Sequence, residues 1–330
     1  MNLSSQVIES SYSACRRLGR QAGSNFPAAF LLLPRAKRRA MDALYAFMRH
    51  SDDLVDNPEP GRVPEESLLH WRAAVEHALL GCFEPPSQWG VPVGSGGLKL
   101  RRHRPGDTAG ARGLYHHEDE VGRAILPAVV DAVQQFHIPH EHLRAAMDGV
   151  EMDLGRRRYQ NFGELRKYCE LVASAVGLAC IHIWGFESAE ALGPARSAGI
   201  ALQLTNILRD LKEDCEQDRV YLPLDDIQEC GYSVEDLCEG VVSAPFFRLM
   251  ELEIGRAEQF YREGADLFRW LQPDGQRIFG VMMATYRAIL AEVKRRPGQV
   301  FARRVQVGWP KKLRIVARWA LFAPSAAGML

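Results

Sequence analysis

The sequence predicts an all-α fold, in which a single bundle of helices surrounds a central cavity. Apolar residues recur at helical spacing through most of the 330 residues, and alternating β patterns are nearly absent. Two acidic clusters, at 52–56 and 206–214, each lie within a strongly apolar helical pattern. Because carboxylates are costly in apolar surroundings unless their charge is compensated, the clusters indicate a polar site inside the bundle.

The first half of the chain is predicted to be a series of helices with one interruption. Pro34 suits the first turn of a helix that continues over 35–55, where apolar residues form one stripe. The Asn-Pro-Glu-Pro-Gly run at 57–61 ends this helix. Residues 84–113 are rich in Gly and Pro and have no helical period, which predicts a flexible insertion. The other helices expected in this half cover 67–80, 118–136 and 140–153.

The second half is also predicted to be mainly helical. A long apolar helix is expected over 162–184, and the helix over 189–216 carries the second acidic cluster. Pro310 suits the first turn of the last helix, which runs to Phe322. The remaining helices cover 233–239, 244–271 and 273–296.

The segment 297–330 is predicted to be a basic extension with an apolar tip. From Lys294 onward every charged side chain is basic, and the apolar run Trp319-Ala-Leu-Phe322 follows the last of them. A basic helix with Trp and Phe at one end can lie on an anionic membrane surface, so peripheral membrane contact through this tail is expected. The alternative is a solvated helix that packs on the body of the protein.

Composition narrows the range of functions. The 41 basic and 41 acidic residues give a formal net charge of zero, so no global field favours nucleic acid as a partner. The seven cysteines are scattered and form no CxxC pair, which is typical of reduced thiols. Neither a signal-peptide core nor an apolar stretch of about 18 residues is visible. The expected location is therefore the cytoplasm, or the inner face of a membrane to which the protein binds peripherally.

Helical spacing places the polar side chains of each acidic cluster on one face. Asp52 and Asp56 are four residues apart, as are Asn206, Asp210 and Asp214. Two such faces opposite each other would repel strongly unless divalent cations lay between them. Oxygen ligands suit hard cations, and Mg²⁺ typically combines one or two carboxylates with substrate phosphates. The two faces therefore predict a cavity that holds a diphosphate through Mg²⁺, with solvated helix starts as the alternative.

The residues around both clusters resemble the squalene/phytoene synthase family. Residues 43–56, Ala-Leu-Tyr-Ala-Phe-Met-Arg-His-Ser-Asp-Asp-Leu-Val-Asp, are similar to its first signature. Residues 203–214, followed by Asp-Arg-Val-Tyr-Leu-Pro at 218–223, resemble its second. Residues 148–154 and 168–173 match its central helices, and the likeness covers roughly residues 10 to 300. The resemblance implies an isoprenoid-synthase-type helical bundle, with 1–330 as one domain.

The resemblance also implies a reaction, the Mg²⁺-dependent head-to-head (1′–1) condensation of two prenyl diphosphates with release of diphosphate. The expected substrates are two farnesyl diphosphates, which give presqualene diphosphate and a squalene-type C30 product. The alternatives are two geranylgeranyl diphosphates, which give phytoene, and a non-catalytic helical assembly factor. A head-to-tail elongase would be expected to show Asp-Asp-x-x-Asp in its second region, which is absent here. Squalene formation would require NADPH, for which the sequence has no recognisable fingerprint.

These reactions belong to the biosynthesis of sterols, hopanoids or carotenoids, so downstream isoprenoid enzymes are further possible partners. By position, the resemblance makes Asp52, Asp56, Asn206, Asp210 and Asp214 the Mg²⁺-binding residues. Loss of diphosphate from an allylic substrate would then depend on these residues, and Asp52, Asp56 and Asp210 are counted as catalytic.

Other roles implied by the resemblance fall to basic and aromatic residues. Tyr168 is the tyrosine expected against the carbocation, where a ring face stabilises charge and a hydroxyl can move a proton. The arginines expected to bind diphosphate, through bidentate contacts, are Arg49, Arg209 and Arg219.

The substrate tunnel is expected to need dry walls, because water would quench a carbocation. Its predicted lining residues are Tyr45, Tyr286, Gln203 and Phe26, with Leu204, Ala173, Val176 and Gly177. Many family members carry Ser-x-Ser before the Phe of the first signature, whereas this chain has Ser24-Asn25-Phe26. Ser24 and Asn25 are therefore the candidates for that diphosphate contact. For each lone aromatic residue, packing in the core is the alternative role.

Overall fold

The computed structural model describes residues 5–21, 29–81, 119–155 and 157–322, and it confirms the all-α fold. Within these ranges, β structure is limited to two isolated bridges, Arg158–Val220 and Phe186–Leu271. The predicted insertion at 84–113 lies outside the described residues, as do Ser24, Asn25 and Phe26.

The elements of the amino-terminal half are α1 (Ser5–Gln21), η1 (Phe30–Leu32), α3 (Arg35–Asp56), α4 (Pro64–Leu80), α5 (Glu120–Gln135) and α6 (His140–Gly155). They are followed by α7 (Phe162–Cys169), the π-helical turn η2 (Glu170–Ser174), α8 (Ala175–Trp184), η3 (Ala189–Ala191), α9 (Leu192–Arg209) and α10 (Leu211–Glu216). The carboxyl-terminal elements are α11 (Leu224–Glu229), α12 (Val234–Glu239), α13 (Ala244–Ala265), η4 (Asp266–Trp270), α14 (Pro273–Arg295), α15 (Gln299–Ala302) and α16 (Trp309–Leu321).

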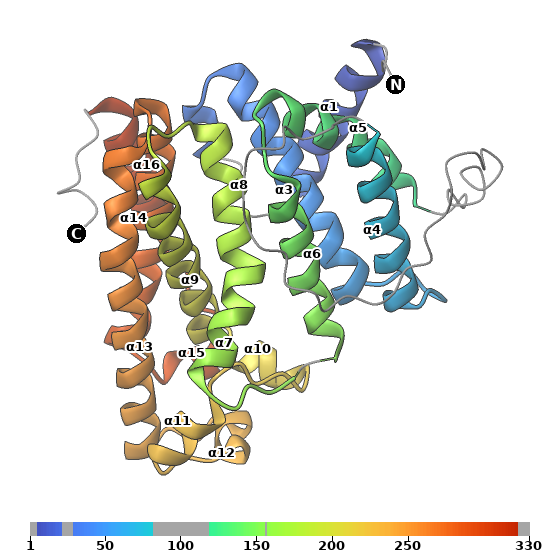
Figure 1. Cartoon of the computed structure of the whole chain (residues 1–330). Coiled ribbons are helices and arrows are strands. Elements are labelled where there is room, and N and C mark those ends of the chain that lie inside the picture. The colour runs from blue at the N-terminus through green and yellow to red at the C-terminus, as the bar shows by residue number, and fades with distance from the viewer. Residues whose placement is uncertain (1–4, 22–28, 82–118, 156, 323–330) are drawn as a thin grey trace.

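The long helices form two groups on either side of the central run formed by η2 and α8. Helices α1, α3 and α5 pack against one another, and α4 and α6 cover α3. On the other side, α9 packs against α13 and α14, and α16 packs against α14 (Figure 1). The continuous run η2–α8 contacts both α6 and α9, so it joins the two groups. This arrangement brings the acidic ends of α3 and α9 toward the same region.

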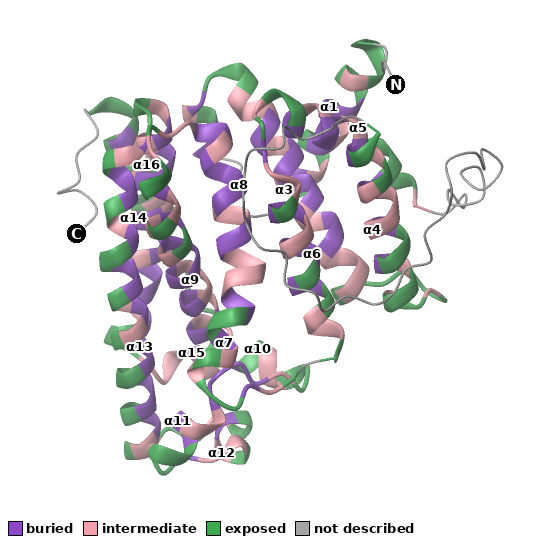
Figure 2. Ribbon diagram, in the orientation of Figure 1, coloured by how far each residue is buried: buried purple, intermediate pink, exposed green. Residues whose placement is uncertain are grey.

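Large apolar side chains from both groups form the core. Phe30, Phe47, Trp71 and Phe246 are almost completely buried. Burial of such side chains contributes roughly 1.5–3 kcal/mol each, which drives the helices together. Figure 2 shows the resulting pattern, with buried residues on the inward sides of the helices and exposed residues on the outer sides of α4 and α13.

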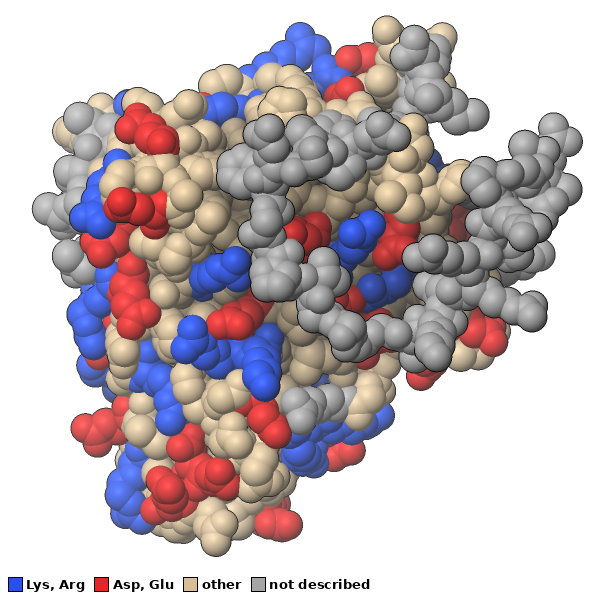
Figure 3. Space-filling model, in the orientation of Figure 1, with Lys and Arg blue, Asp and Glu red and all other residues tan. Residues whose placement is uncertain are grey.

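Charged residues on the surface are mixed in sign. On the face seen in Figure 3, basic and acidic side chains are interspersed. Arg72, for example, pairs with Asp148 at 2.6 Å and with Glu151 at 3.0 Å. Such exposed pairs typically contribute less than about 1 kcal/mol each, so the core dominates stability.

The predicted helix over 162–184 is wrong in one respect, because a π-helical turn interrupts it at η2. Two glycines let neighbouring helices approach this turn closely. A Cβ on Gly149 of α6 would lie 2.6 Å from Val172 Cγ1, and one on Gly199 of α9 would lie 2.6 Å from Ser174 Cα. Both distances are too short for a real Cβ, so α6 and α9 can clamp η2 only with glycine at these positions.

The predicted helix over 189–216 is also interrupted, at the second acidic cluster. Helix α9 ends at Arg209, and Asp210 has φ −105° and ψ 15° before α10 begins. Backbone hydrogen bonds still join Asp210 N to Asn206 O and Asp214 N to Asp210 O, both at 2.9 Å. The chain therefore bends at Asp210 while the polar side chains of the cluster remain close to one another.

Smaller differences concern helix ends and the amino terminus. The helix expected over 244–271 is divided into α13 and the 3₁₀ turn η4. Helix α1 was not predicted, because its sequence is largely polar; its buried residues include Tyr12 and Cys15, which pack against the bundle. Its few apolar residues lie on one face, which the contacts with α3 and α5 bury.

Candidate active site

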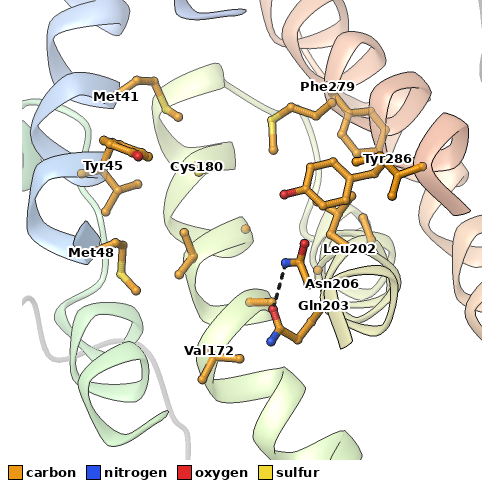
Figure 4. Close-up of a pocket in the computed structure, with 18 of the residues that line it drawn as sticks. Met41, Tyr45, Met48, Val172, Cys180, Leu202, Gln203, Asn206, Phe279 and Tyr286 are labelled. Atoms are coloured by element: carbon orange, nitrogen blue, oxygen red, sulfur yellow. Dashed lines mark hydrogen bonds between the residues drawn. The ribbon is translucent and has the colours of Figure 1, made fainter. Parts of the chain in front are cut away.

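A cavity of about 620 Å³ lies between α3, η2–α8, α9 and α14. Figure 4 shows Met41, Tyr45 and Met48 of α3 facing Leu202 of α9 and Tyr286 of α14 across it. The wall is mainly apolar and is completed by Phe30, Leu44, Val172, Ala173, Val176, Gly177, Cys180, Trp184, Phe279, Met282 and Ile289. Its polar residues are Arg49, Asp52, Gln203, Asn206, Arg209, Arg304, Gln306 and Lys312. The cavity thus combines a mainly apolar wall with a charged region.

Most of the residues proposed from the sequence as lining residues lie on this wall. They include Tyr45, Tyr286, Gln203, Ala173, Val176 and Gly177. Leu204 instead packs into the core and is only 2% exposed, while Leu202 faces the cavity. The reason is the 100° step between helical residues, which places 202, 203 and 206 toward the cavity and 204 away from it.

The first acidic cluster is held at the carboxyl-terminal end of α3. Burial, together with the nearby carboxylates of Asp56 and Asp153, raises the pKa of Asp52 to about 7, while Arg49 opposes the shift. Arg49 itself pairs with Asp53, its Nε donating to Asp53 Oδ2 at 2.9 Å. Asp52 therefore lines the cavity without a direct cationic partner among the ion pairs of the described residues.

The second cluster is already bound by arginines. Arg209 Nε donates to Asp210 Oδ1 at 2.7 Å, and Arg304 Nε donates to the same oxygen at 3.1 Å. Arg304 also lies 3.7 Å from Glu213. Burial, together with the neighbouring Asp210 carboxylate, raises the pKa of Asp214 to about 8. The Asp214 carboxyl therefore holds its proton up to near neutral pH, whereas two arginines compensate the charge of Asp210.

The two clusters meet through Arg219 and Asp153. Arg219 Nη2 lies 3.0 Å from Asp56 Oδ1, although these residues are far apart in the sequence. Asp153 acts electrostatically on both Asp52 and Asp214, which places the end of α6 between the two clusters. The two acidic faces thus lie opposite each other, as the sequence analysis assumed, and Asp153 at the end of α6 adds a third acidic group.

Asp153 also holds a group of tyrosines, of which the sequence analysis predicted a role for Tyr168 only. Tyr168 donates to Asp153 Oδ2 and Tyr221 donates to Asp153 Oδ1, both at 3.0 Å. The Tyr168 and Tyr221 rings stack with centroids 5.1 Å apart, and Tyr159 lies against both. Burial raises the pKa of Asp153 to about 6, although the two tyrosine hydrogen bonds oppose the shift. Tyr168 is itself buried next to the acidic clusters and does not line the cavity.

A signal for Asp153 was present in the sequence. It ends the apolar helical pattern at 148–154, the same context that drew attention to Asp52. Tyr221 follows Arg219 by two residues in the run Asp-Arg-Val-Tyr-Leu-Pro, which was recognised without a role being given to the tyrosine. Their meeting with Tyr168 depends on the contact between chain segments that the Arg158–Val220 bridge joins.

Arg304 and Lys312 are the second group that the sequence analysis missed. Both were assigned to a basic extension directed at a membrane, but the structure places Arg304 on Asp210 and both residues at the cavity. Val305 and Val307, between them, are buried and also line the cavity. Residues 304–307 and Lys312 are therefore part of the wall of the site.

The residues of this site suit Mg²⁺ ions that a diphosphate and protein side chains bind together; they are less suited to a metal site made of protein ligands alone. Among the described residues, no group of three or more His, Cys, Asp or Glu side chains is arranged to hold a metal ion. Asn206 Oδ1 is nevertheless buried without a hydrogen-bond partner, while its Nδ2 donates to Gln203 at 3.3 Å (Figure 4). An orphaned oxygen beside carboxylates is the kind of donor that a hard cation can use.

Comparison with known proteins supports one family. The family model described as squalene/phytoene synthase matches residues 20–311. The chain is 32% identical to a 15-cis-phytoene synthase from Synechocystis sp., covering 93% of this chain and 83% of that protein. It is 32% identical to a phytoene synthase from Arthrospira platensis, covering 92% and 90%.

Solved structures show the same fold. A dehydrosqualene synthase in complex with a ligand has a TM-score of 0.74 at 23% identity, covering 95% of this chain and 96% of that one. A squalene synthase from Alicyclobacillus acidocaldarius has a TM-score of 0.71 at 23% identity, covering 88% and 95%.

The helical bundle around an apolar cavity with charged residues on its wall is an isoprenoid-synthase-like fold. With the matched family model and relatives, the chain belongs to the squalene/phytoene synthase family. It is a prenyltransferase that condenses two prenyl diphosphates head to head. Among the described residues, no helix is both long and apolar enough to span a bilayer.

Proposed function

We propose that this enzyme joins two C20 geranylgeranyl diphosphates to form phytoene. The observation that carries the proposal is the identity of about one third, over nearly the whole chain, to curated phytoene synthases. The cavity has a mainly apolar wall and one charged region, which suits two prenyl chains whose diphosphates lie near the acidic clusters.

This substrate replaces the one first expected from the sequence, farnesyl diphosphate. No residue of the tunnel wall supported that expectation, because the depth of the tunnel depends on packing that the sequence does not reveal. The two structural neighbours that make C30 products are 23% identical to this chain, so they support its fold and carry no information about its substrate.

The arginines and carboxylates are proposed to hold the diphosphates. Arg49, Arg209 and Arg219 each pair with an aspartate and can turn part of their guanidinium toward phosphate oxygens. Asp52, Asp56, Asn206, Asp210 and Asp214 would hold Mg²⁺ with the substrate. When bound, Mg²⁺ would neutralise the charge that develops on the departing diphosphate.

Tyr168 is proposed to act on the reaction from behind the cavity wall, with Asp153 as its positioning residue. The hydrogen bond from Tyr168 to Asp153 fixes the hydroxyl, and the stacked Tyr221 ring fixes the plane of the Tyr168 ring. Because the Tyr168 ring is buried and stacked on Tyr221, its proposed effect on a cation in the cavity is electrostatic, through the negative potential of the Tyr168–Asp153 pair. The apolar wall excludes water, which protects a carbocation from capture.

Product analysis with purified protein tests the proposal. The protein is incubated with Mg²⁺ and with either geranylgeranyl or farnesyl diphosphate, each with and without NADPH. We expect a C40 hydrocarbon from geranylgeranyl diphosphate, formed equally well without NADPH because phytoene formation needs no reduction.

Matched variants show that the product comes from this site. Asp210→Asn removes a carboxylate that two arginines bind, whereas Asp148→Asn removes an exposed one that pairs with Arg72 outside the cavity. The first should lose product and the second should keep it. A C30 product from farnesyl diphosphate, with none from geranylgeranyl diphosphate, would overturn the C20 proposal and restore the C15 substrate.

A further inference from the structure

Helix α16 is held on the bundle by one buried side. Trp319 is 3% exposed and packs so closely on α14 that a Cβ on Gly280 would lie 2.5 Å from its ring. The Trp319 ring also lies 6.0 Å from Phe268, and Arg277 Nη1 donates to Trp319 O at 2.6 Å. Because Trp319 is locked in place, the rotation of α16 about its own axis is fixed, and so is the face that it turns outward.

The outward face of α16 is apolar. Trp309, Leu313, Leu321 and Phe322 are 73%, 58%, 77% and 67% exposed. Residues 309, 313, 317 and 321 follow one another at intervals of four, so they form a single stripe along the helix. Single exposed apolar residues are normal on a protein surface, but a stripe of large ones along a helix indicates a surface that a protein partner or a membrane covers.

Cations border this stripe. Lys311, Arg314 and Arg318 are exposed and lie beside the stripe on the helical wheel, away from the buried side at Trp319. No Asp or Glu occurs in residues 297–322, and Glu292 of α14, which lies within electrostatic range of Lys311, is paired with Arg295, so the net charge beside the stripe is positive. An apolar stripe with Trp at one end and a row of cations beside it is the pattern of a helix that lies in the interface of an anionic bilayer.

We propose that the outward face of α16, formed by Trp309, Leu313 and Leu321 with Lys311, Arg314 and Arg318, binds the surface of an anionic membrane. Trp309 and the leucines enter the boundary between headgroups and acyl chains, while the cations contact lipid phosphates. The helix lies on the membrane and does not cross it. Charge complementarity selects a lipid surface over an apolar protein partner, because the charged residues that α16 itself places beside the stripe are all cations, which match a uniformly anionic surface.

The position of α16 connects this surface to the cavity. The segment immediately before the stripe, with Val305 and Val307, lines the cavity, as does Lys312 within α16. On the proposed function, both substrate and product carry long prenyl chains that partition into bilayers. A membrane docked at α16 would therefore lie beside one wall of the cavity, where such chains could pass between bilayer and site.

Co-sedimentation of the full chain with lipid vesicles tests the proposal without substrate. The two probes are vesicles of phosphatidylglycerol with phosphatidylcholine and vesicles of phosphatidylcholine alone. We expect binding to the anionic vesicles that weakens as salt is added, because screening reduces the cationic contribution. The triple variant Trp309→Ser, Leu313→Ser, Leu321→Ser should bind them about tenfold or more weakly.

Two further variants separate the roles of area and charge. Leu69 and Leu80 of α4 are 64% and 63% exposed, so Leu69→Ser with Leu80→Ser removes similar apolar area elsewhere and should leave vesicle binding unchanged. Lys311→Gln, Arg314→Gln and Arg318→Gln together should abolish the preference for anionic vesicles. Circular dichroism and thermal unfolding check that each variant remains folded.

Several results would overturn the proposal. The wild-type chain could fail to bind either vesicle, or the α16 triple variant could bind as the wild type does. Sedimentation velocity provides a third test, because dissociation of a dimer by the triple variant, with vesicle binding unchanged, would make the face a contact between copies. Turnover in detergent micelles is measured in parallel, so failure of the membrane proposal is distinguished from failure of the proposed reaction.

Discussion

Gly199→Ala tests whether close packing of α9 on the π-helical turn holds the cavity wall in place. An added Cβ would lie 2.6 Å from Ser174 Cα and 2.8 Å from Ser174 N, backbone atoms that cannot rotate away. Ordinary van der Waals contact begins at 3.4 Å, so α9 and η2 would have to separate locally by about 0.8 Å.

The expected cost follows from this displacement. Overpacking of a dense interior by one methyl group costs about 1–3 kcal/mol, and the backbone contact places this site toward the upper end. Asn206 and Gln203 lie on α9, and Val172 and Ala173 lie on η2, so the two walls of the cavity would move relative to each other. A misplacement of about 1 Å can reduce turnover on the order of 10²-fold.

Gly255→Ala is the matched control. Gly255 is exposed on α13, and an added Cβ would meet nothing within 4 Å. Alanine should therefore stabilise the helix by about 1 kcal/mol through propensity alone, with turnover unchanged. Urea unfolding followed by circular dichroism gives the free energies of unfolding, and product formation gives turnover. The reasoning would be refuted if Gly199→Ala were as stable as the wild type, or destabilised yet fully active.

Three further predictions concern charge and hydrogen bonding. Asp52→Asn should reduce turnover by on the order of 10²–10³-fold with circular dichroism unchanged; near-normal turnover would contradict its assignment to Mg²⁺ and diphosphate. Tyr168→Phe keeps the ring but loses the bond to Asp153, so turnover should fall about tenfold while stability changes by only about 1 kcal/mol; unchanged turnover would remove the hydroxyl from the mechanism. Burial raises the pKa of Glu253 from 4.5 to about 8, although Arg256 opposes the shift. The stabilising contribution of Glu253 is therefore complete below pH 4.5 and is lost as pH rises through 8. The free energy of unfolding of Glu253→Gln, measured across this range, should depend less on pH than that of the wild type, and equal slopes would refute the prediction.

Local spacing along the chain accounts for what the sequence determined by itself. Helices were predictable because apolar residues at 3.6-residue spacing need a buried face, and this pattern is independent of what covers the face. The same spacing puts Asp52 with Asp56, and Asn206 with Asp210, on shared faces of their helices. The family followed from these clusters and the residues around them, because each signature is a short continuous run.

The bend at Asp210 and the π-helical turn at 170–174 were beyond local reasoning. At both places the local sequence favours a straight α-helix, and contacts with other elements prevail. Gly149 and Gly199 admit the backbone of η2, and Arg304 reaches Asp210 from a segment about ninety residues away. Propensities of a few tenths of a kcal/mol per residue are too small to resist such tertiary contacts.

Only the tertiary structure decided which distant groups share the site. Arg219 meets Asp56, and Tyr168 and Tyr221 meet on Asp153, because packing brings together the ends of helices that are far apart in the chain. It likewise divided the basic carboxyl-terminal segment between the cavity, at Arg304 and Lys312, and the exposed face of α16. Residue spacing fixes which side of a helix a group occupies, but the partner across the gap is set by burial of the whole core, which no single segment encodes.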